Sequence, residues 1–499
     1  MALIKVSNLS FCYPGSSDPV FDQVSFRIDT EWRLGIVGGN GKGKTTFLRL
    51  LNGEYDYGGQ IQNTVPVRYC PGMIDAGSGD APAVNVLGER YLDYELWKVI
   101  RELHEMEMEE DILYQSWGSL SPGERTRIML AFLFADDASY LLLDEPTNNL
   151  DERTREIVKQ YLGHKKSFIL VSHERDVLDA CADHILAINR SSIEVCKGNF
   201  SSWYENKKNR DNFEIQKDNK LRKEIGRLER SARESAKWAG KAEQTKIGFN
   251  PIEEDRWKDT RCYIGEKARR MEKRKKNLEK RCMREIEEKK ALLKDVETEH
   301  DLKLFAKCGQ SGTYVWADKI DIRYKSKEVC RNVSFTVERG ERVLISGKNG
   351  CGKTSVIKAL LGERENMRGK LTVKGGLTVS YLPQDGHFCT GSLKELAKDR
   401  GIDLAVLLSV LRQMGLERKQ FEKPLSQFSD GQKKKALLAV SLCESADLYI
   451  WDEPMNFVDL FTRIQLENLI LKYQPTMLFI EHDQYFSSKI ATKEVKIGG

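Results

Sequence analysis

Short apolar runs bounded by glycines or acids recur along the chain and predict buried strands of a parallel sheet. They occupy 34–37, 140–143 and 168–171 in the first half, and 343–346, 448–451 and 477–480 in the second. Each run is short and apolar at successive positions, as in strands that are covered on both faces. The segments 46–50 and 355–359, each just after the first strand of its half, have a helical pattern. Each half is therefore expected to form an α/β domain.

The stretch from about 205 to 300 has a different period, with apolar residues three and four positions apart. The repeating positions are Leu221, Ile225, Leu228, Ala232 and Ala239, and then Ala268, Met271, Leu278, Cys282, Ile286, Leu293 and Val296. This spacing is typical of amphipathic helices with narrow apolar seams. Gly248-Phe249-Asn250-Pro251 would break a helix between them. We expect an antiparallel helical hairpin with its tip at about 240–262 and arms of roughly 35 residues, or about 50 Å.

An internal repeat surrounds this stretch. The segment 38–45 returns as 347–354, and Asp144-Glu145-Pro146 returns as Asp452-Glu453-Pro454, at offsets of 309 and 308 residues. Two homologous modules therefore flank one unrepeated linker. The predicted domains are residues 1–204, a linker at 205–305, and residues 306–499.

Composition narrows the class of protein. The 499 residues are 40% hydrophobic and 31% charged, with no apolar run long enough to cross a membrane. The first residues lead straight into a strand-like pattern, so we expect no secretory leader. Eleven cysteines without Cys-x-x-Cys spacing disfavour a disulfide framework and a zinc site. We expect a cytoplasmic protein. Residues 205–300 contain 29 Lys and Arg against 21 Asp and Glu, whereas the whole chain contains 80 against 75, so positive charge is concentrated in the linker.

Both glycine-rich segments match Gly-x-x-x-x-Gly-Lys-Thr, and each lies between a predicted strand and a predicted helix. In this context backbone N–H groups converge on phosphate oxygens, the lysine reaches the terminal phosphates, and the threonine hydroxyl contacts Mg²⁺. The predicted ATP contacts in the first module are Gly38, Asn40, Gly41, Gly43, Lys44, Thr45 and Thr46. Those in the second are Gly347, Asn349, Gly350, Gly352, Lys353, Thr354 and Ser355.

Acids end the next apolar strand of each module. Asp144 and Asp452 are predicted to hold Mg²⁺ together with Thr45 and Thr354, while Glu145 and Glu453 are predicted to orient or deprotonate the hydrolytic water. A third strand ends in His173 or His482, which are candidate γ-phosphate sensors. Gln384 can contact Mg²⁺ or the water, whereas the first module has Gly72 at that place, so the two sites should differ.

Two further features have ordinary structural explanations. Ser121 with Gly123, and Ser429 with Gly431, stand at predicted helix starts, where serine is a common N-cap but also suits an anion. Their position about 20 residues before the acidic strands favours a nucleotide contact. Tyr13 and Tyr324 precede the phosphate loops at similar distances, and adenine stacking and simple packing are equally compatible with them.

These motifs together resemble the ABC ATPase nucleotide-binding domain, present twice. Two such domains with a charged helical linker resemble the ABC-F translation factors. The second module further resembles the Lsa, Vga and Sal resistance branch, in the segment Trp451-Asp452-Glu453-Pro454-Met455-Asn456-Phe457-Val458-Asp459 and in the later Glu481-His482-Asp483. The resemblance implies two ATP molecules sandwiched between the domains, pairing Lys44 with Ser429 and Lys353 with Ser121. It also implies binding of the 70S ribosome at the E site of 23S rRNA, action on P-site tRNA and the peptidyl transferase centre, and protection from lincosamides, pleuromutilins and group A streptogramins.

The chain departs from the family pattern at the signature and after the acids. Pro122 and Asp430 replace the first signature glycine, and Asn149 replaces a histidine. A carboxylate at Asp430 would lie near the phosphates bound by Lys44. We therefore expect the Lys44 site to bind or hydrolyse ATP less well than the Lys353 site.

Residues 267–284 of the linker contain ten Lys and Arg but only two acids. Charge runs are often solvated spacers, but this imbalance favours contact with RNA phosphates. The predicted RNA contacts are Lys267, Arg269, Arg270, Lys273, Arg274, Lys275, Lys276, Lys280, Arg281 and Arg284, and the predicted tip contacts are Trp238, Phe249 and Trp257. We expect no DNA or membrane partner, and a monomer off the ribosome.

Other functions remain open from the sequence. A housekeeping ABC-F translation factor would share every motif named above. The ATPase subunit of a membrane transporter would share the two modules, but it gives no reason for a basic helical hairpin. A chromosome or DNA-repair ATPase usually divides one ATPase across its coiled coil, whereas each half here has a complete motif set.

Overall fold

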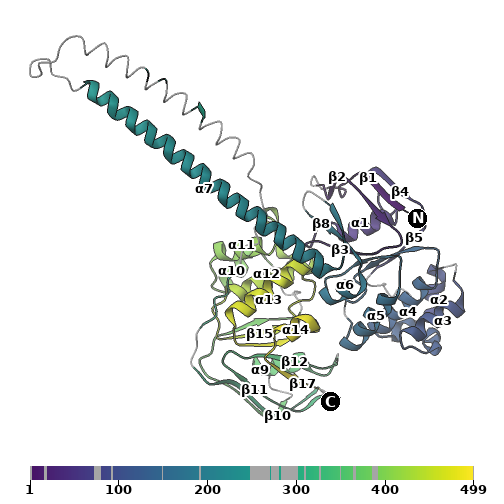
Figure 1. Cartoon of the computed structure of the whole chain (residues 1–499). Coiled ribbons are helices and arrows are strands. Elements are labelled where there is room, and N and C mark those ends of the chain that lie inside the picture. Colours follow the sequence, from purple (N-terminus) through teal and green to yellow (C-terminus); the bar gives the residue numbers. More distant parts are fainter. Residues whose placement is uncertain are drawn as a thin grey trace, which may run out of the picture. The chain divides into compact units, whose positions relative to one another are not determined.

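The computed structural model describes residues 3–497 with gaps. The residues left out are 16–18, 72–79, 92–93, 149, 190–192, 248–269, 271–272, 274–279, 282–301, 308–310, 325–326, 349, 364–366 and 385–390. The chain divides into two compact units, one made of Met1–Trp203 and His300–Gly499 and the other of Tyr204–Glu299. The first unit contains both modules, and the second contains the linker (Figure 1).

The first module is built on a mixed sheet in the order β5-β6-β7-β3-β8-β9. Its strands are β3 (Arg33–Val37), β5 (Val67–Cys70), β6 (Tyr140–Asp144), β7 (Phe168–Val171), β8 (His184–Ile188) and β9 (Ile193–Lys197). All but the β8–β9 pair are parallel. The three runs predicted as buried strands are β3, β6 and β7, and the side chains of β6 and β7 are buried throughout. Because they are parallel, their carboxyl ends meet at one edge of the sheet.

A smaller antiparallel sheet and a set of helices complete this module. The small sheet has the order β2-β1-β4, from β1 (Leu3–Phe11), β2 (Phe21–Asp29) and β4 (Gly58–Asn63). The helices are α1 (Lys44–Leu51), α2 (Ala83–Arg90), α3 (Leu96–Glu105), α4 (Pro122–Phe134), α5 (Glu152–His164) and α6 (Arg175–Cys181). One apolar cluster joins α1 to both sheets, and Phe47 and Leu48 of α1 are fully buried in it.

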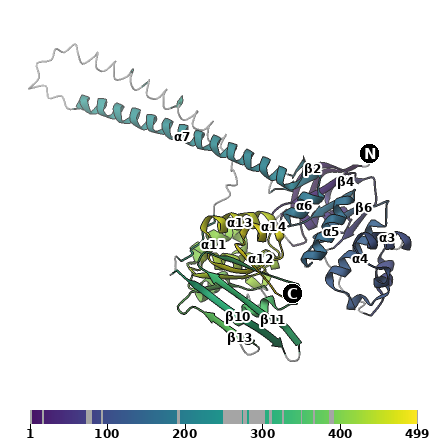
Figure 2. The same cartoon turned by 60° about the horizontal axis from the view of Figure 1, so that its bottom comes forward.

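The second module repeats this plan. Its parallel sheet has the order β14-β15-β16-β12-β17, and a separate antiparallel layer has the order β11-β10-β13 (Figure 2). The strands are β10 (Thr313–Tyr324), β11 (Lys327–Glu338), β12 (Arg342–Ser346), β13 (Met367–Val373), β14 (Val379–Leu382), β15 (Leu448–Asp452), β16 (Met477–Ile480) and β17 (Lys493–Lys496). The helices are α9 (Lys353–Leu360), α10 (Leu393–Asp399), α11 (Leu404–Gln413), α12 (Asp430–Cys443), α13 (Leu460–Tyr473) and α14 (Gln484–Ile490). The predicted α/β fold of both modules is confirmed.

Helix α7 (Phe200–Ile247) extends over 48 residues and contributes the first part of the linker unit. It begins before the predicted boundary at 204 and continues past Gly240 into the range predicted as the tip. At about 1.5 Å per residue it is roughly 70 Å long. Ile225, on the predicted apolar seam, is buried, whereas Phe213 is exposed. The boundaries of the three domains remain predictions.

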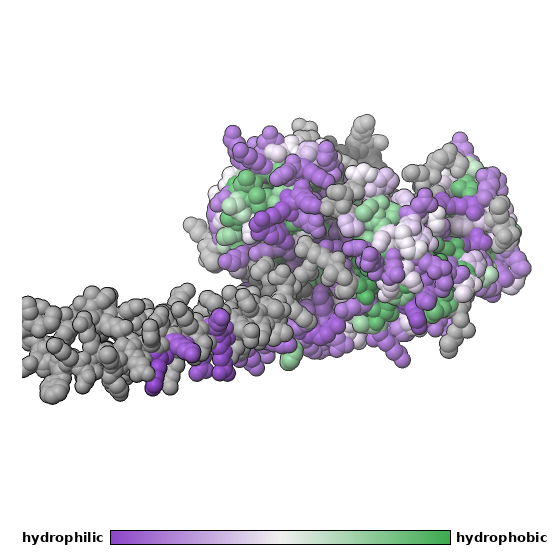
Figure 3. All heavy atoms as spheres, turned by 90° about the horizontal axis from the view of Figure 1, so that it is seen from above, coloured by the Kyte–Doolittle hydropathy of each residue, from purple (hydrophilic) through white to green (hydrophobic). Residues whose placement is uncertain are grey.

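Hydrophilic side chains predominate on the face in Figure 3, and hydrophobic ones form scattered patches. None of the described helices is long and apolar enough to span a bilayer.

Candidate functional site

Each phosphate loop brings a glycine into the left-handed region immediately before its lysine. Gly43 has φ 91° and Gly352 has φ 96°, and a Cβ at Gly43 would lie only 2.6 Å from Val20 Cγ1. Both reasons restrict the position to glycine. The loop then continues into α1 or α9, whose first N–H groups have no partner within the helix and can face an anion.

The two lysines fold back onto their loops. Lys44 Nζ donates to Gly38 O at 2.8 Å and to Gly39 O at 3.2 Å. Lys353 Nζ donates to Gly347 O at 2.6 Å and lies 3.2 Å from His482 Nε2. Burial lowers the pKa of both ammonium groups. Each is therefore a buried cation that a phosphate can partner.

The acids at the ends of β6 and β15 are placed by an unusual backbone. Glu145 and Glu453 have φ angles of 51° and 47°, in the left-handed region that non-glycine residues seldom adopt. Such strain persists where surrounding structure holds it, and it is frequent in active sites. The Glu453 N–H donates to Ile480 O and the Glu145 N–H to Val171 O, which tie each acid to the neighbouring strand.

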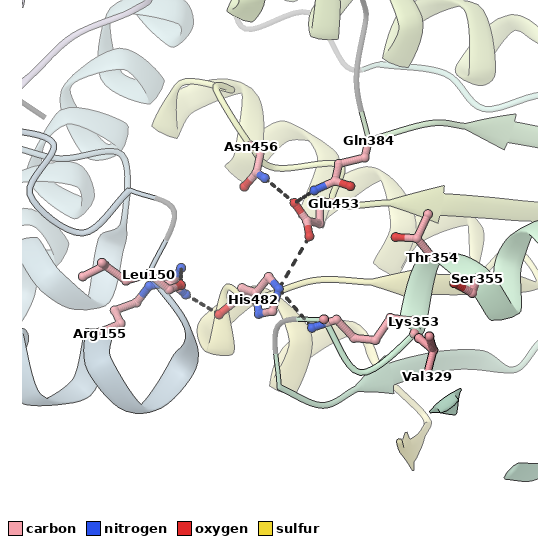
Figure 4. A pocket seen from close by; sticks show the side chains of 12 residues that line it. Leu150, Arg155, Val329, Lys353, Thr354, Ser355, Gln384, Glu453, Asn456 and His482 are labelled. Carbon is pink, nitrogen blue, oxygen red and sulfur yellow. Dashed lines mark hydrogen bonds and ion pairs between the residues drawn. The ribbon is translucent and has the colours of Figure 1, made fainter. Parts of the chain in front are cut away.

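A cavity of about 480 Å³ surrounds Lys353 (Figure 4). Its lining residues are Leu150, Arg155, Val329, Gly350, Gly352, Lys353, Thr354, Ser355, Gln384, Glu453, Asn456 and His482. Seven of them (Gly350, Gly352, Lys353, Thr354, Ser355, Glu453 and His482) were predicted as ATP or catalytic residues, and Gln384 as a metal ligand. Leu150 and Arg155 come from the first module.

Glu453 supplies a carboxylate to the lining of this cavity. Its Oε2 accepts from Gln384 Nε2 at 2.8 Å and from Asn456 Nδ2 at 2.6 Å, and its Oε1 lies 3.6 Å from His482 Nε2. Burial raises the pKa of the Glu453 carboxyl, but the contacts with His482 and Gln384 outweigh burial and leave that pKa below its usual value. The carboxylate is ionised at neutral pH and can accept a proton from water.

The residues beside Glu453 fit a magnesium ion. Asp452 is completely buried, and burial raises its pKa to about 6. Thr354 lies close enough to lower that pKa, but no hydrogen bond of normal geometry reaches either carboxylate oxygen among the described residues. Two buried acceptors without a donor suit a cation with its waters. Thr354, Asp452 and Gln384 would hold Mg²⁺, which neutralises phosphate charge when bound.

The corresponding acids near Lys44 have different surroundings. Asp144 accepts a hydrogen bond from Tyr69 Oη at 3.0 Å, and Glu145 Oε1 lies 3.3 Å from His173 Nε2. Thr45 lies close enough to Asp144 to lower the pKa of its carboxyl, although burial leaves that pKa raised. Burial raises the pKa of Glu145 to about 8 and holds the pKa of His173 well below its usual value. Near neutral pH Glu145 is therefore mostly protonated, unlike Glu453.

The signature serines are helix caps. Ser121 Oγ accepts from the Glu124 N–H at 3.3 Å, and the Ser121 N–H donates to Glu124 Oε2 at 2.8 Å. Ser429 forms the same reciprocal pair with Gln432 at the start of α12. These are capping boxes. Neither Ser121 nor Gly123 lines the cavity at Lys353.

The signature of the second module packs against the phosphate loop of the first. Asn40 Nδ2 donates to Phe457 O at 2.9 Å, and a Cβ at Gly431 would lie 2.7 Å from both of those atoms. Phe457, at the position matching Asn149, has φ 61°. The structure thus brings the loop that contains Lys44 into close contact with the signature helix that Ser429 caps. The pairing of Lys44 with Ser429 itself stays a prediction.

On the side of the Lys353 cavity, the first module contacts the segment that carries His482. Arg155 Nη1 donates to His482 O, and Gln484 Nε2 donates to Glu152 Oε1 at 2.7 Å. Arg175 lies 4.7 Å from the centre of the Tyr485 ring. Apart from His482, none of these residues was predicted, because only contacts between residues more than 300 positions apart reveal them.

The remaining predicted ATP contacts have mixed outcomes. Tyr13 Oη lies 2.7 Å from Thr46 Oγ1, and its ring contacts Phe11 and Tyr55 edge-on. Tyr13 is therefore beside the phosphate loop and 39% exposed, which leaves a face for a base. Gly41 and Gly350 have left-handed φ angles of 75° and 78°. Asn349 and the side chain of Tyr324 lie outside the described residues.

Most predicted linker contacts also lie outside the described residues. Arg270, Lys273, Lys280 and Arg281 are described, and each is helical and exposed. Trp238 lies in α7, but its side chain is not described, and Phe249 and Trp257 fall in a gap. The contacts of the linker with RNA remain a prediction.

The family described as "ABC transporter" matches residues 21–148 and 330–456, which is 255 of the 499 residues. The chain belongs to this family. It is accordingly an ATPase with two ATP-binding domains that use ATP with Mg²⁺. No cluster of three or more metal-binding His, Cys, Asp or Glu side chains occurs in the described part of the chain.

Individual relatives are more distant. The chain is 28% identical to ribosome protection protein VmlR of Bacillus subtilis, over 99% of this chain and 86% of that one. It is 26% identical to ATP-binding protein Uup of Caulobacter vibrioides, over 96% and 75%. ABC transporter F family member 2 of Arabidopsis thaliana is 23% identical, over 99% and 77%. These similarities agree with the predicted ABC-F group.

Among solved structures, the fold resembles the archaeal ribosome recycling factor aABCE1, in a crystal structure with the stalk protein aP1. The TM-score is 0.60 at 19% identity, and the match covers 96% of this chain and 85% of that one. An RNase-L inhibitor structure gives a TM-score of 0.57 at 20% identity, over 93% and 83%. At these identities the likeness concerns the fold of two tandem ATPase domains.

Proposed function

We propose that this protein is an ATP-dependent ribosome protection factor. ATP closes the two modules, the closed form binds the E site of the 70S ribosome, and the linker acts on P-site tRNA and the peptidyl transferase centre. Hydrolysis then reopens the modules and releases the protein. The observation that carries this proposal is the similarity to VmlR over 99% of the chain, which includes the linker as well as the ATPase modules.

The linker supports the proposal by its length and charge. Helix α7 is long enough to act roughly 70 Å from its first residue. Arg270, Lys273, Lys280 and Arg281 present exposed cations on the later part of the linker, where they suit phosphate oxygens. We infer that this basic segment binds 23S rRNA or tRNA, and that residues near the tip decide which drugs are displaced.

The two ATP sites would have unequal roles in this cycle. The Lys353 cavity combines an ionised Glu453 with Gln384 and His482, whereas Glu145 beside Lys44 is mostly protonated and its module has Gly72 in place of the glutamine. We infer that Lys353 marks the main hydrolytic site, with Glu453 as general base. The closely packed Lys44 site would act chiefly in holding the modules together.

Trapping on ribosomes tests the cycle. The double variant Glu145→Gln, Glu453→Gln should bind ATP without hydrolysing it and should co-sediment with 70S ribosomes in ATP, whereas the wild type is released. The same variant with ADP is the matched control, because closure requires the γ-phosphate. Release of the double variant in ATP at the wild-type rate would refute the proposal.

Drug susceptibility separates protection from housekeeping. A sensitive bacterium that expresses the chain should become resistant to lincosamides, pleuromutilins or group A streptogramins but not to an aminoglycoside. Deletion of the tip should abolish resistance while ATPase activity and ribosome binding persist. Ribosome trapping without any change in susceptibility would indicate a housekeeping translation factor. Co-fractionation with membranes, without ribosomes, would instead indicate a transporter subunit.

A further inference from the structure

Lys434, in α12, is a buried lysine whose ammonium group joins two segments of the second module. The residue is 3% exposed. Its Nζ donates to Pro383 O at 3.0 Å, to Gln384 O at 3.0 Å and to Asp452 O at 3.1 Å. A lysine has three N–H donors, and three carbonyl oxygens satisfy them. Hydrogen bonds from a charged donor are stronger than those between neutral groups, so the ammonium group holds these three carbonyls together.

The three carbonyls belong to two chain segments of the Lys353 cavity. Pro383 and Gln384 follow β14, and Asp452 ends β15. The side chain of Gln384 reaches Glu453 Oε2 at 2.8 Å. Lys434 therefore ties the backbone at Gln384 to the end of β15. The residue that follows β15 is Glu453, the acid that the Gln384 side chain contacts.

The first module has no such tie among its described residues. At an offset of 308 residues, Lys434 corresponds to Thr126. The Thr126 hydroxyl donates to Pro122 O at 3.0 Å, within its own helix. The first module also has Gly72 where the second has Gln384. The lysine and the glutamine thus occur together in one module and are both replaced in the other.

We propose that Lys434 is a positioning residue for ATP hydrolysis at the Lys353 site. By holding the backbone of residues 383–384 against β15, it keeps the Gln384 amide on Glu453, the acid that faces the nucleotide. It does not contact the nucleotide. The proposal concerns turnover by the protein alone, so it does not depend on ribosome binding or drug protection.

The test is a double-mutant cycle for ATP turnover in the full-length chain. Every protein carries Glu145→Gln, so that turnover reports the Lys353 site. The variants are Lys434→Met, Gln384→Ala and the two combined. Displacing a catalytic contact by about 1 Å can lower kcat by about 100-fold. We expect Lys434→Met to lower kcat by about 30- to 100-fold with KM changed less than about threefold, because the nucleotide contacts remain.

Coupling distinguishes positioning from general stability. If Lys434 acts through Gln384, the double variant should have the kcat of Gln384→Ala alone, within about twofold. Thr126→Met and Lys433→Met, at the equivalent and the neighbouring position, should leave kcat unchanged. Thermal unfolding and binding of a fluorescent ATP analogue verify that each variant is folded. Should Lys434→Met not fold, Lys434→Gln, which keeps two donors, replaces it in the same cycle.

Three outcomes would overturn the proposal. One is wild-type kcat in the folded Lys434 variant, another is a Gln384→Ala variant without any loss, and the third is a double variant whose loss is the product of the single losses. A chain that passes this test but never binds ribosomes would leave the lysine assignment intact and refute the proposed function.

Discussion

The difference in ionisation between Glu145 and Glu453 leads to a quantitative prediction for ATP turnover. Burial raises the pKa of Glu145 to about 8, while the contacts with His482 and Gln384 keep the pKa of Glu453 below its usual value. Only an ionised carboxylate can accept a proton from the attacking water. We replace each glutamate with glutamine, one at a time, and measure phosphate release without ribosomes at several pH values.

The expected sizes follow from the ionised fractions. With a pKa of about 8, Glu145 is about 24% ionised at pH 7.5, while Glu453 is almost fully ionised. If the two sites turn over independently and equally when ionised, the Glu453→Gln variant retains about 20% of wild-type turnover and the Glu145→Gln variant about 80%. Raising the pH to 9 ionises about 91% of Glu145, so Glu453→Gln should gain about fourfold.

The direction of the pH effect provides the control. The raised pKa means that the active form of Glu145 increases as pH rises through 8, whereas Glu453 is ionised throughout this range. Glu145→Gln should therefore be nearly independent of pH between 7.5 and 9, apart from any loss of folding, which circular dichroism monitors. If Glu145→Gln abolished turnover while Glu453→Gln left it intact, the assignment of the main site would be wrong.

Three further predictions concern packing and charge. Gly431→Ala places a Cβ 2.7 Å from Asn40 Nδ2 and from Phe457 O, and should lower ATP turnover by at least about tenfold because it blocks closure of the modules. Gly123→Ala is the control and should have a smaller effect, because the nearest neighbour of its Cβ is a Thr154 methyl group at 3.1 Å. An equal loss of turnover in both variants would contradict this reasoning. Lys435 pairs with Asp459, both almost fully buried, so Lys435→Met should lower the free energy of unfolding by about 3–5 kcal/mol. Lys433→Met, at a pair in which Asp430 is exposed and Lys433 is partly buried, should cost less than about 1 kcal/mol in the same denaturant titration. Replacing Arg270, Lys273, Lys280 and Arg281 with glutamate should weaken ribosome binding and flatten its salt dependence. Replacing the exposed Lys220 and Lys223 of α7 with glutamate is the control and should have a smaller effect. Equal effects would show that the later basic segment has no specific role in binding.

The sequence by itself determined the features whose chemistry is local in the chain. The phosphate loops, the acids after β6 and β15, and the parallel strands could be predicted because each needs only a short run of residues with a fixed spacing, and the repeat showed every run twice. The repeat also aligned Gln384 of the second module with Gly72 of the first, and this difference predicted that the two ATP sites are unequal. The linker helix was predicted from its period, although α7 begins earlier and ends later than expected.

Only the tertiary structure decided how those residues act on one another. The pKa values of Glu145 and Glu453 differ because their burial and partners differ, and those partners, Gln384 and His482 for Glu453, come from separate strands. In the sequence, Lys434 is one lysine in a basic helical run. Only the structure shows that its ammonium group donates to carbonyl oxygens at the ends of two strands. Arg155 reaches a segment more than 300 residues away. Motif spacing specifies which groups are present, whereas burial and long-range packing set their charge and orientation.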